Sequence, residues 1–559
     1  MPQPPIEQPQ AEHIRHVQQG MNDSDEVHLL PEGMAEHIEN LEIEKAGARR
    51  RRNGVVDIGG RADTPNGMWN MYETVLEQDA LFGHYGGKIY IAPGAGLLQE
   101  RASGVSLTDS LHYGIPGRYD GRLSTYVIQS AQNDSDMTLT SHLTILKDTV
   151  GSTNDNWTQV SMAPQCACWF QNRFWVGLSS YGGQSYETLW WSELGDGGAY
   201  SANNTLQIEP GIGGNIVQLL PMRGFNPLIV VFKRTAIATI EPTWGSSSSL
   251  VPQAADALDT IKTNIRLISH KIGCEAPLSV QYVPGAPGGD IYFLARDGVR
   301  ALTRANDDTI SGVSKPLSHP IRDLIKRINF KYTQKIVSAV WDNKYFLAVP
   351  LDGATENTHL LVFDLQNPGW KVETWSPKAL VSTRMTDEVD RLWMQYNTIT
   401  ADCSISSTES SYHIFKAYVG LAEPGGDPVI YDEKTRALSF NDILQKKRWD
   451  EMAISFRNDA TETCTMGIMY NIDHRGWVTA GSAVFGSAPG SEVVMGETPL
   501  PWGVNTTAVR VWKMSLADAP PGYFIQLRYF GTSDLSIPVV LETSVYARPV
   551  YRETDNEIT

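Results

Sequence analysis

The sequence predicts an all-β protein: a β-propeller of about six to eight blades, followed by a C-terminal β-sandwich and preceded by a flexible N-terminal arm. Short aromatic and β-branched runs alternate with Gly-, Ser- and Asn-rich turns along most of the chain, which is typical of antiparallel strands. From about residue 440 the runs become longer and alternate more regularly, as in a sandwich of about a hundred residues. Helical spacing is rare.

The clearest strand pattern lies between Gln165 and Pro242, and it is interpreted as two successive propeller blades. Its apolar runs are Cys168–Leu178, Thr188–Ser192, Ile216–Leu220, Leu228–Phe232 and Ala236–Ile240. Tryptophans at this density within strands are expected to fill the core between sheets, and Cys166 and Cys168, two residues apart, are expected to be small core residues on one face.

Grouping the strand-like runs in fours gives the domain organisation. The predicted segments are an N-terminal arm (1–35), a β-propeller (36–440), a β-sandwich (441–552) and a polar tail (553–559). Within the propeller, Pro320–Ile328 is predicted to be a short helix, because its apolar residues recur at the spacing of one helical face.

Composition limits the classes of partner. The chain of 559 residues has 46 basic and 63 acidic side chains, a formal charge of −17, so its surface as a whole repels nucleic acid and anionic membranes. Such charge merely aids solubility in most acidic proteins, although a negative wall would also keep DNA from adhering to a conduit. The apolar runs are too short to span a bilayer, so no membrane insertion is expected.

The five cysteines are an odd number, without a CxxC pair, and predict neither a disulfide framework nor a zinc site. The first residues contain no apolar segment of a secretory signal, so folding in a reducing cytoplasm is expected. His13 and His16 share one face of a helical turn, but two histidines at this spacing are more often surface residues than metal ligands.

A search for catalytic patterns finds none of the common nucleotide-binding, hydrolase or metalloprotease motifs. The candidate carboxylate pairs are Glu193 with Asp196 and Asp307 with Asp308. Both pairs lie in predicted turns, where acidic residues usually stabilise the turn itself. The Asp-box of sialidases is absent. We therefore predict no enzymatic activity and no catalytic, cofactor-binding or metal-binding residues.

Four consecutive arginines, Arg49–Arg52, follow a predicted strand, Ile38–Glu44. A turn at Ala46-Gly47 leads into this arginine row and Asn53-Gly54 closes it. Arginines alternate between the faces of a strand, so some must meet carboxylates or solvent. A solvated edge or an intersubunit salt-bridge row is preferred over a phosphate contact in so acidic a chain. The predicted interface residues are Arg49, Arg50, Arg51, Arg52, Glu42 and Glu44.

The chain contains several short sequence segments whose order resembles that in the tail nozzle (tail tubular, or hub) proteins of short-tailed bacteriophages, which are built on a β-propeller. These segments cover most of residues 36–550. They are NLEIEKAGARRRRNG (Asn40–Gly54), FQNRFWVG (Phe170–Gly177), LWWSELGD (Leu189–Asp196), LIVVFKRTAI (Leu228–Ile237), IYFLARDGVR (Ile291–Arg300), LSHPI (Leu317–Ile321) and KRWDEM (Lys447–Met452).

This resemblance implies a structural protein of the virion tail, assembled in the host cytoplasm, with six copies forming a ring that encloses the channel for genome retention and DNA ejection. The implied partners are the tail adaptor protein, tail fibres or needle, and DNA that passes without specific binding. A closed ring requires two complementary faces on each subunit, and the arginine row with Glu42 and Glu44 is a candidate for one. Two alternatives stay open: a glycan-binding or glycan-degrading propeller of the tail, and a fibre-docking adaptor.

Overall fold

The computed structural model divides the chain into two compact units, each discontinuous in sequence. Unit 1 comprises Met1–Val55, Val362–Thr374 and Tyr418–Thr559, and unit 2 comprises Val56–Leu361 and Trp375–Ala417. The structure describes residues 9–14, 17–44, 48–61, 65–73, 78–86, 88–92, 99–102, 112–119, 122–129, 143–147, 157–160, 164–178, 187–201, 204–222, 227–242, 265–283, 285–287, 289–304, 310–384, 389–396, 412–420, 422–424, 426–458, 464–485, 493–495, 498–500, 510–533 and 538–550.

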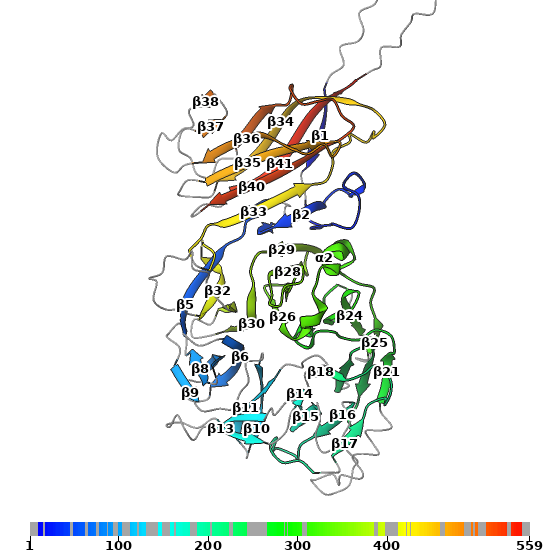
Figure 1. The fold of residues 1–559 in the computed structure, drawn as a ribbon, viewed down its shortest axis with the longest axis vertical. Coiled ribbons are helices and arrows are strands. Elements are labelled where there is room, and N and C mark those ends of the chain that lie inside the picture. Colours follow the sequence, from blue (N-terminus) through cyan, green and yellow to red (C-terminus); the bar gives the residue numbers. More distant parts are fainter. Residues whose placement is uncertain are drawn as a thin grey trace, which may run out of the picture. The chain divides into compact units, whose positions relative to one another are not determined.

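Unit 2 is a β-propeller with seven antiparallel sheets among its described residues (Figure 1). The first four sheets are β6–β9 (Pro65–Glu73, Gln78–Tyr85, Lys88–Ala92, Gln99–Ala102), β10–β13 (His112–Tyr119, Arg122–Gln129, Leu143–Lys147, Trp157–Val160), β14–β17 (Pro164–Phe170, Arg173–Leu178, Thr188–Trp191, Thr205–Gln207) and β18–β21 (Ile216–Met222, Leu228–Lys233, Ile237–Ile240, Ile265–Ser269). The sequence prediction of an all-β propeller is confirmed.

The remaining three sheets complete the circle. They are β22–β25 (Gln281–Tyr282, Ile291–Ala295, Gly298–Arg304, Ile310–Val313), β26–β28 (Val337–Trp341, Lys344–Val349, His359–Asp364) and β30–β31–β32–β5 (Pro377–Arg384, Asp390–Tyr396, Tyr412–Gly420, Gly54–Arg61). The last sheet takes its outer strand, β5, from the segment before the first sheet, so the two ends of the propeller are hydrogen-bonded to each other. This closure removes the exposed edges that a linear row of sheets would leave.

The inner strands form the ring. The first strand of each sheet contacts the first strand of the next, and β30 contacts β6. The exception is β18, which contacts the 3-10 turn η2 (Pro277–Ser279) just before β22. Figure 1 shows β6, β14, β18, β26 and β30 around the centre of unit 2. The stretch Gln165–Pro242 contains the whole of the third sheet and three strands of the fourth, which agrees with the interpretation as successive blades.

One predicted run is two strands. Cys168–Leu178 contains the end of β14, a two-residue turn and all of β15, with Phe170 opposite Arg173. The turn residues Gln171 and Asn172 have φ angles of 48° and 57°, both left-handed, as a type I′ hairpin requires. The polar residues Gln171, Asn172 and Arg173 interrupt the apolar run at this turn, so the sequence does mark the boundary between the two strands.

Three of the four tryptophans of this stretch (Trp175, Trp190 and Trp191) are buried in the core, as predicted, and Trp169 is partly buried. Trp175 and Trp191 are 0% and 1% exposed, and their ring centroids lie 5.2 Å apart. Cys166 and Cys168 belong to the same buried cluster, which also includes residues of the fourth sheet. The burial of these apolar side chains therefore stabilises the contact between two neighbouring blades.

A buried lysine also joins these blades. The Nζ atom of Lys233, on β19, lies 2.9 Å from Oε1 of Glu187 and donates to the carbonyls of Ile208 and Glu209 at 2.9 and 3.0 Å. The Lys233 side chain is 0% exposed, so all three donors of its ammonium group are satisfied inside the propeller.

The predicted helix Pro320–Ile328 is present as a 3-10 turn, η3 (His319–Ile321), followed by the α-helix α2 (Arg322–Lys326) and then η4 (Phe330–Lys335). The apolar side chains that predicted it, Ile321, Leu324, Ile325 and Ile328, are all buried. The helix prediction is confirmed, with its first turn tighter than α-helical.

Unit 1 contains two sheets that form a β-sandwich. The first has the order β3-β4-β41-β34-β39, with β1 also paired to β41, and the second includes β29-β2-β33-β40-β35-β36. The strands are β1 Gln10–Ile14, β2 Ala35–Glu39, β3 Leu41–Ile43, β4 Arg49–Arg51, β29 Gly369–Glu373, β33 Val429–Thr435, β34 Lys447–Asn458, β35 Cys464–Ile472, β36 Trp477–Phe485, β39 Arg510–Ser515, β40 Ile525–Ser533 and β41 Pro538–Pro549. A separate hairpin joins β37 (Val493–Met495) and β38 (Thr498–Leu500).

The two sheets contact each other through both polar and apolar side chains. The Tyr529 hydroxyl on β40 donates to Thr543 Oγ1 on β41 at 2.7 Å. Gly481 on β36 faces Met514 on β39 so closely that an added methyl group would lie 3.1 Å from the sulfur atom. Glycine at this position therefore permits close packing of the sheets.

The predicted boundaries differ from these units. The arm (1–35) includes β1, which pairs along β41 from Gln10 opposite Ala547 to Ile14 opposite Thr543. Segments of residues 36–440, including β2, β29 and β33, belong to unit 1 rather than to the propeller. Sequence order alone separates the two ends of the chain, whereas pairing brings them into one sandwich.

Several predictions lie outside the described residues. They concern His16, the turn at Ala46-Gly47, the pair Asp307 and Asp308, and the polar tail.

Candidate functional site

The arginine row forms β4 and its extension in unit 1. β4 pairs with β3, which places Glu42 opposite Arg50 and Ile43 opposite Arg49. The side chains of Arg49, Arg51 and Arg52 are each at most 1% exposed. Arg50, whose side chain is 35% exposed, lies on the other face of the strand.

Arg50 binds the two predicted glutamates. Its Nε and Nη2 atoms donate to Glu42 Oε2 at 2.9 and 2.6 Å, and Nε lies 3.9 Å from Glu44 Oε1. The structure therefore brings together these three members of the predicted interface, but as neighbours within one chain. Part-exposed pairs of this kind contribute about 1 kcal/mol or less.

Arg49 extends across the sandwich to the second sheet. Its Nε atom lies 3.0 Å from Oε2 of Glu433 on β33, and each side chain is 1% exposed. The Arg49 guanidinium also lies over the ring of Tyr529 at 5.8 Å. Burial, opposed by the charge of Arg49, raises the pKa of the Glu433 carboxyl.

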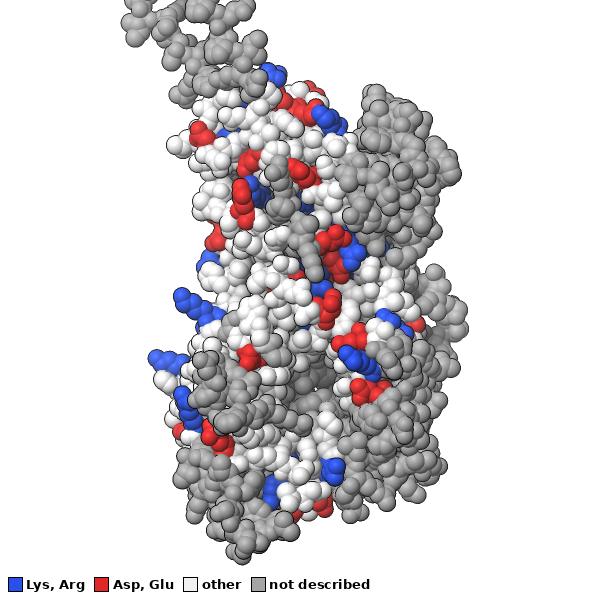
Figure 2. Space-filling view, turned by 180° about the vertical axis from the view of Figure 1, so that it is seen from behind, with Lys and Arg blue, Asp and Glu red and all other residues white. Residues whose placement is uncertain are grey.

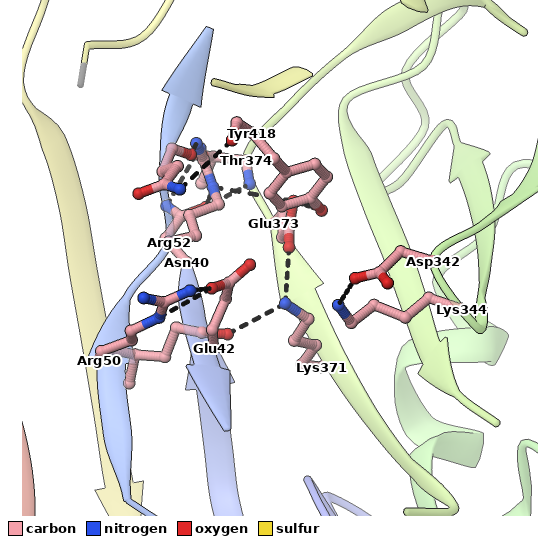
Figure 3. A network of polar contacts seen from close by, with 12 residues as sticks. Asn40, Glu42, Arg50, Arg52, Asp342, Lys344, Lys371, Glu373, Thr374 and Tyr418 are labelled. Atoms are coloured by element: carbon pink, nitrogen blue, oxygen red, sulfur yellow. Dashed lines mark hydrogen bonds and ion pairs between the residues drawn. The ribbon is translucent and has the colours of Figure 1, made fainter. Parts of the chain in front are cut away.

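Arg52 is the centre of a buried polar network in unit 1 (Figure 3). Its Nε donates to Asn40 Oδ1 at 2.9 Å and lies 3.7 Å from Glu373 Oε2. Its Nη2 donates to the carboxylate of Glu423, and its Nη1 donates to the carbonyl of Asn53 at 3.1 Å. The fully buried cation therefore has two acidic partners, which offset its loss of hydration.

Asn40 adopts the left-handed conformation, with φ of 54°, between β2 and β3. The side-chain amide donates to Thr374 Oγ1 at 2.8 Å and to the carbonyl of Ile430 at 2.7 Å. The predicted continuous strand Ile38–Glu44 is thus wrong: it is interrupted at Asn40, a residue that tolerates this conformation. Alternation in the sequence could not reveal the break.

A second pair of opposite charges completes the network. Lys371 Nζ lies 2.9 Å from Glu373 Oε1 and donates to the carbonyl of Leu41 at 3.2 Å, and the Tyr418 hydroxyl donates to Glu373 Oε2 at 2.7 Å. Burial, and then the charge of Glu373, raises the pKa of Tyr418 well above its usual value. The network therefore joins the three sequence segments that make up unit 1.

These positions change the role assigned to the arginine row. Arg49, Arg51 and Arg52 are buried within the chain, so their charges are not exposed for contact with a second subunit. Arg50→Glu and Arg51→Glu together are therefore expected to impair folding, because the carboxylate introduced at the buried position 51 would be desolvated.

The described carboxylates of the predicted acid pair are engaged in local structure. Asp196 Oδ1 accepts from the Gly198 amide at 2.8 Å, as a turn-forming aspartate does. Glu193 Oε1 accepts from Asn204 Nδ2 at 3.2 Å. His13 is one of the two histidines considered above as metal ligands. Its Nδ1 atom lies 2.8 Å from Ser544 Oγ and 3.1 Å from Glu542 Oε1, across the β1–β41 pair.

Unit 2 also has a basic cleft of roughly 880 Å³ between the β23–β24 turn and the η3–α2–η4 segment. Four basic side chains line it: Arg296, Arg322, Lys326 and Lys331. The Arg296 guanidinium lies over the ring of Phe330 at 4.5 Å from its centroid. A cluster of cations beside an aromatic face can bind an anion. The sequence alone does not reveal this cleft, because its residues come from two separate turns.

Elsewhere the exposed charges are mixed. Figure 2 shows basic and acidic side chains interspersed on the face in view, without one large patch of either sign among the described residues. Among the described residues, one group of three side chains has ligand atoms close enough together to hold a metal ion: Glu26, His28 and His474. None of the described helices is both long and apolar enough to cross a membrane.

Comparison with known proteins identifies no family for the chain. No family model matches, and no curated protein matches. Solved structures with similarity include BBS1N in complex with ARL6DN (11% identity, TM-score 0.37, 66% of this chain and 97% of that chain). A Trypanosoma rangeli sialidase in complex with DANA has 10% identity and a TM-score of 0.28, over 96% of this chain and 97% of that chain. A Phanerochaete chrysosporium exo-β-1,3-galactanase with galactose has 8% identity and a TM-score of 0.25, over 88% and 100%. Similarity this weak says nothing about activity.

Proposed function

We propose that the chain is a structural subunit of a short-tailed phage tail nozzle, which forms a hexameric ring around the channel for genome retention and DNA ejection. It has no catalytic role in this proposal. The supporting observation is that the segments that resemble nozzle proteins form the framework of both units. This is the pattern expected of a protein whose function is its shape.

The propeller segments illustrate the point. Phe170–Gly177 forms the end of β14, the turn and most of β15, and Ile291–Arg300 forms β23 and the start of β24. In β19, which opens the segment Leu228–Ile237, every residue is buried. Their side chains pack between blades, so sequence similarity at these positions preserves the scaffold.

The arginine row supports the same role in a different way. Its charges hold β4 within the sandwich, where Arg49 contacts Glu433 and Arg52 contacts Glu423. A ring contact would therefore use side chains other than Arg49, Arg51 and Arg52. The net charge of −17 suits a subunit whose inner wall repels DNA.

The best candidate for a subunit contact is an apolar groove on the outer face of the second sheet of unit 1. Ile430, on β33, is 56% exposed and lines the groove with Phe530 of β40. The Phe530 ring packs closely on Gly467, which leaves a shallow hollow of roughly 200 Å³. In this proposal the groove holds a side chain of a second copy, because heterologous contacts in a ring pair a groove with a different face of the next subunit.

Electron microscopy and mass photometry of the purified full-length chain, alone and with its adaptor ring, test the proposal. We expect sixfold rings, and Ile430→Lys is expected to reduce ring formation at least tenfold without lowering the unfolding midpoint. Leu444→Lys, at a site 87% exposed in unit 1, is the matched control. A parent chain that stays monomeric with the adaptor overturns the nozzle assignment, and unchanged assembly of Ile430→Lys overturns the groove contact.

A second candidate function is recognition of an anionic glycan by the propeller, and the basic cleft favours it. Carboxylated sugars would meet Arg296, Arg322, Lys326 and Lys331 beside the Phe330 ring. Binding of sialylated and neutral oligosaccharides to the parent chain and to Lys331→Glu distinguishes the two functions. Selective binding that is lost in Lys331→Glu supports the glycan function, and absence of binding in the parent chain rejects it.

A further inference from the structure

We infer that Glu26, His28 and His474 form a binding site for a zinc-like divalent cation in unit 1. Each offers one ligand atom, and these atoms all lie within 4.8 Å of one another. Two imidazoles and one carboxylate are a ligand set that binds Zn²⁺ and leaves a fourth position for water. Sequence spacing does not indicate this site, because its ligands come from distant parts of the chain.

The first two ligands are held by local backbone structure. Glu26 is the N-cap of the 3-10 turn η1 (Val27–Leu29), and its carbonyl accepts from the Leu29 amide at 2.8 Å. The carbonyl of Val27 accepts from the Ala437 amide at 3.1 Å. The segment that carries Glu26 and His28 is thus attached to the chain that follows β33.

The third ligand comes from the β35–β36 hairpin. Asp473 and His474 both have left-handed backbones, with φ of 52° and 58°. Asp473 Oδ1 accepts from the amides of Tyr523 and Phe524 at 2.8 and 3.2 Å, so this carboxylate fixes the hairpin to the start of β40. Its neighbour His474 is left exposed.

Phe524 contacts both histidines. Its ring stacks with His28 at 6.1 Å between centroids and meets His474 edge-to-face at 5.0 Å. These contacts position both imidazoles without using their nitrogen atoms. They therefore restrict the rotamers of the two ligands before a metal binds, which lowers the entropic cost of binding.

An independent observation marks His28 as a ligand. Its Nδ1 atom is buried and has no hydrogen-bond partner among the described residues. Buried polar atoms are usually satisfied, and a metal ion would satisfy this one. Tetrahedral zinc sites place ligand atoms about 3.3 Å apart, from metal–ligand bonds of about 2.0–2.1 Å, so side-chain rotation must draw the three groups closer.

The nature of the donors selects the metal. Imidazole favours Zn²⁺, Co²⁺ and Ni²⁺, whereas Mg²⁺ and Ca²⁺ prefer sites made of oxygen ligands. A bound ion would join η1 to the β35–β36 hairpin, two segments far apart in sequence. Metal binding should therefore stabilise the sandwich of unit 1 against unfolding.

Calorimetric titration of the tag-free, metal-stripped full-length chain with ZnCl₂ tests the site. The parent chain is expected to bind one Zn²⁺ ion, at least tenfold more tightly than Mg²⁺. When Co²⁺ is added in place of Zn²⁺, the chain is expected to show the visible absorption bands of tetrahedral Co²⁺. His28→Phe retains an aromatic ring against Phe524, and His474→Gly retains the left-handed turn. Each is expected to weaken Zn²⁺ binding at least tenfold and to remove the Zn²⁺-dependent rise in the unfolding midpoint.

His270→Ala, at an exposed histidine of unit 2, is the control and should bind Zn²⁺ as the parent does. Glu26→Gln tests the contribution of the carboxylate apart from that of the imidazoles. This change should weaken Zn²⁺ binding less than either histidine change. No saturable Zn²⁺ binding by the parent chain, or parent-like affinity in either histidine variant, overturns the assignment.

Discussion

Arg49 and Glu433 form an ion pair, with 3.0 Å between Nε and Oε2, in which each side chain is 1% exposed. The pair connects the two sheets of the sandwich through β4 and β33. The pKa of Glu433 is raised chiefly by burial, although Arg49 lowers it. The attraction therefore does not fully recover the hydration that both groups lose, and the pair specifies which strands meet more than it adds stability.

This balance predicts strong coupling between the two residues. Arg49→Met or Glu433→Leu alone should each lower the free energy of unfolding of unit 1 by about 3–5 kcal/mol, because each leaves a buried charge unpaired. The double variant should lose much less than the sum. Urea unfolding followed by fluorescence measures the cycle, and additive losses would show that the pair is not coupled.

The pH dependence of this group has a definite sign. The folded chain raises the pKa of Glu433 above its usual value of 4.5. The stability that this group contributes is fully present below its unfolded pKa and is lost as pH rises through its folded pKa. Glu433→Gln should flatten that part of the stability profile. An unchanged slope in acid urea titrations would assign the dependence to other carboxylates.

The loss of stability on removing an arginine side chain should be smaller for the part-exposed Arg50 than for the buried Arg52. Arg50→Ala should cost about 1 kcal/mol or less, since the Arg50 side chain is 35% exposed in its pair with Glu42. Arg52→Ala should cost about 3 kcal/mol or more, because it leaves Glu373 buried without this cation and removes a hydrogen bond to Asn40. Chemical unfolding of the two variants provides the comparison. Equal losses would mean that the buried network adds nothing to the stability of unit 1.

Two glycines of the loop before β23 should respond differently to the same change. A methyl group on Gly289 would lie 2.2 Å from the Leu302 carbonyl oxygen, whereas one on Gly285 would meet nothing within 4 Å. Both have positive φ, of 147° and 70°. Gly285→Ala should cost about 1 kcal/mol of backbone strain, and Gly289→Ala clearly more. Thermal unfolding of the propeller measures both, and equal midpoints would contradict the close approach.

The propeller was predictable because its determinants are local. Runs such as Leu228–Phe232 are apolar throughout, and turns such as Gln171-Asn172 recur at short intervals, so the sheet type follows from neighbouring residues. The helix at Arg322–Lys326 followed from one apolar stripe. Each of these signals lies within about ten residues of chain.

The sandwich and the sites depend on residues distant in sequence. β1 pairs with β41, and Arg49 meets Glu433, but nothing in the sequence near Arg49 identifies that partner. The arginine row therefore looked like a surface charge cluster. Likewise His474 meets His28 only after the hairpin and η1 are placed together, so neither histidine stood out as a metal ligand.

The buried thiols of Cys166 and Cys274 should resist alkylation in the native protein. Burial raises the pKa of each thiol to about 12. At pH 8 the thiolate fraction is then lower than that of an ordinary cysteine by on the order of a thousandfold, and burial also blocks access. The raised pKa contributes stability that is present below the unfolded pKa and is lost as pH rises through about 12. Iodoacetamide labelling with peptide mapping should show little modification until urea unfolds the propeller. Modification of Cys166 or Cys274 in native protein at the rate of unfolded chain would contradict their place in the blade core.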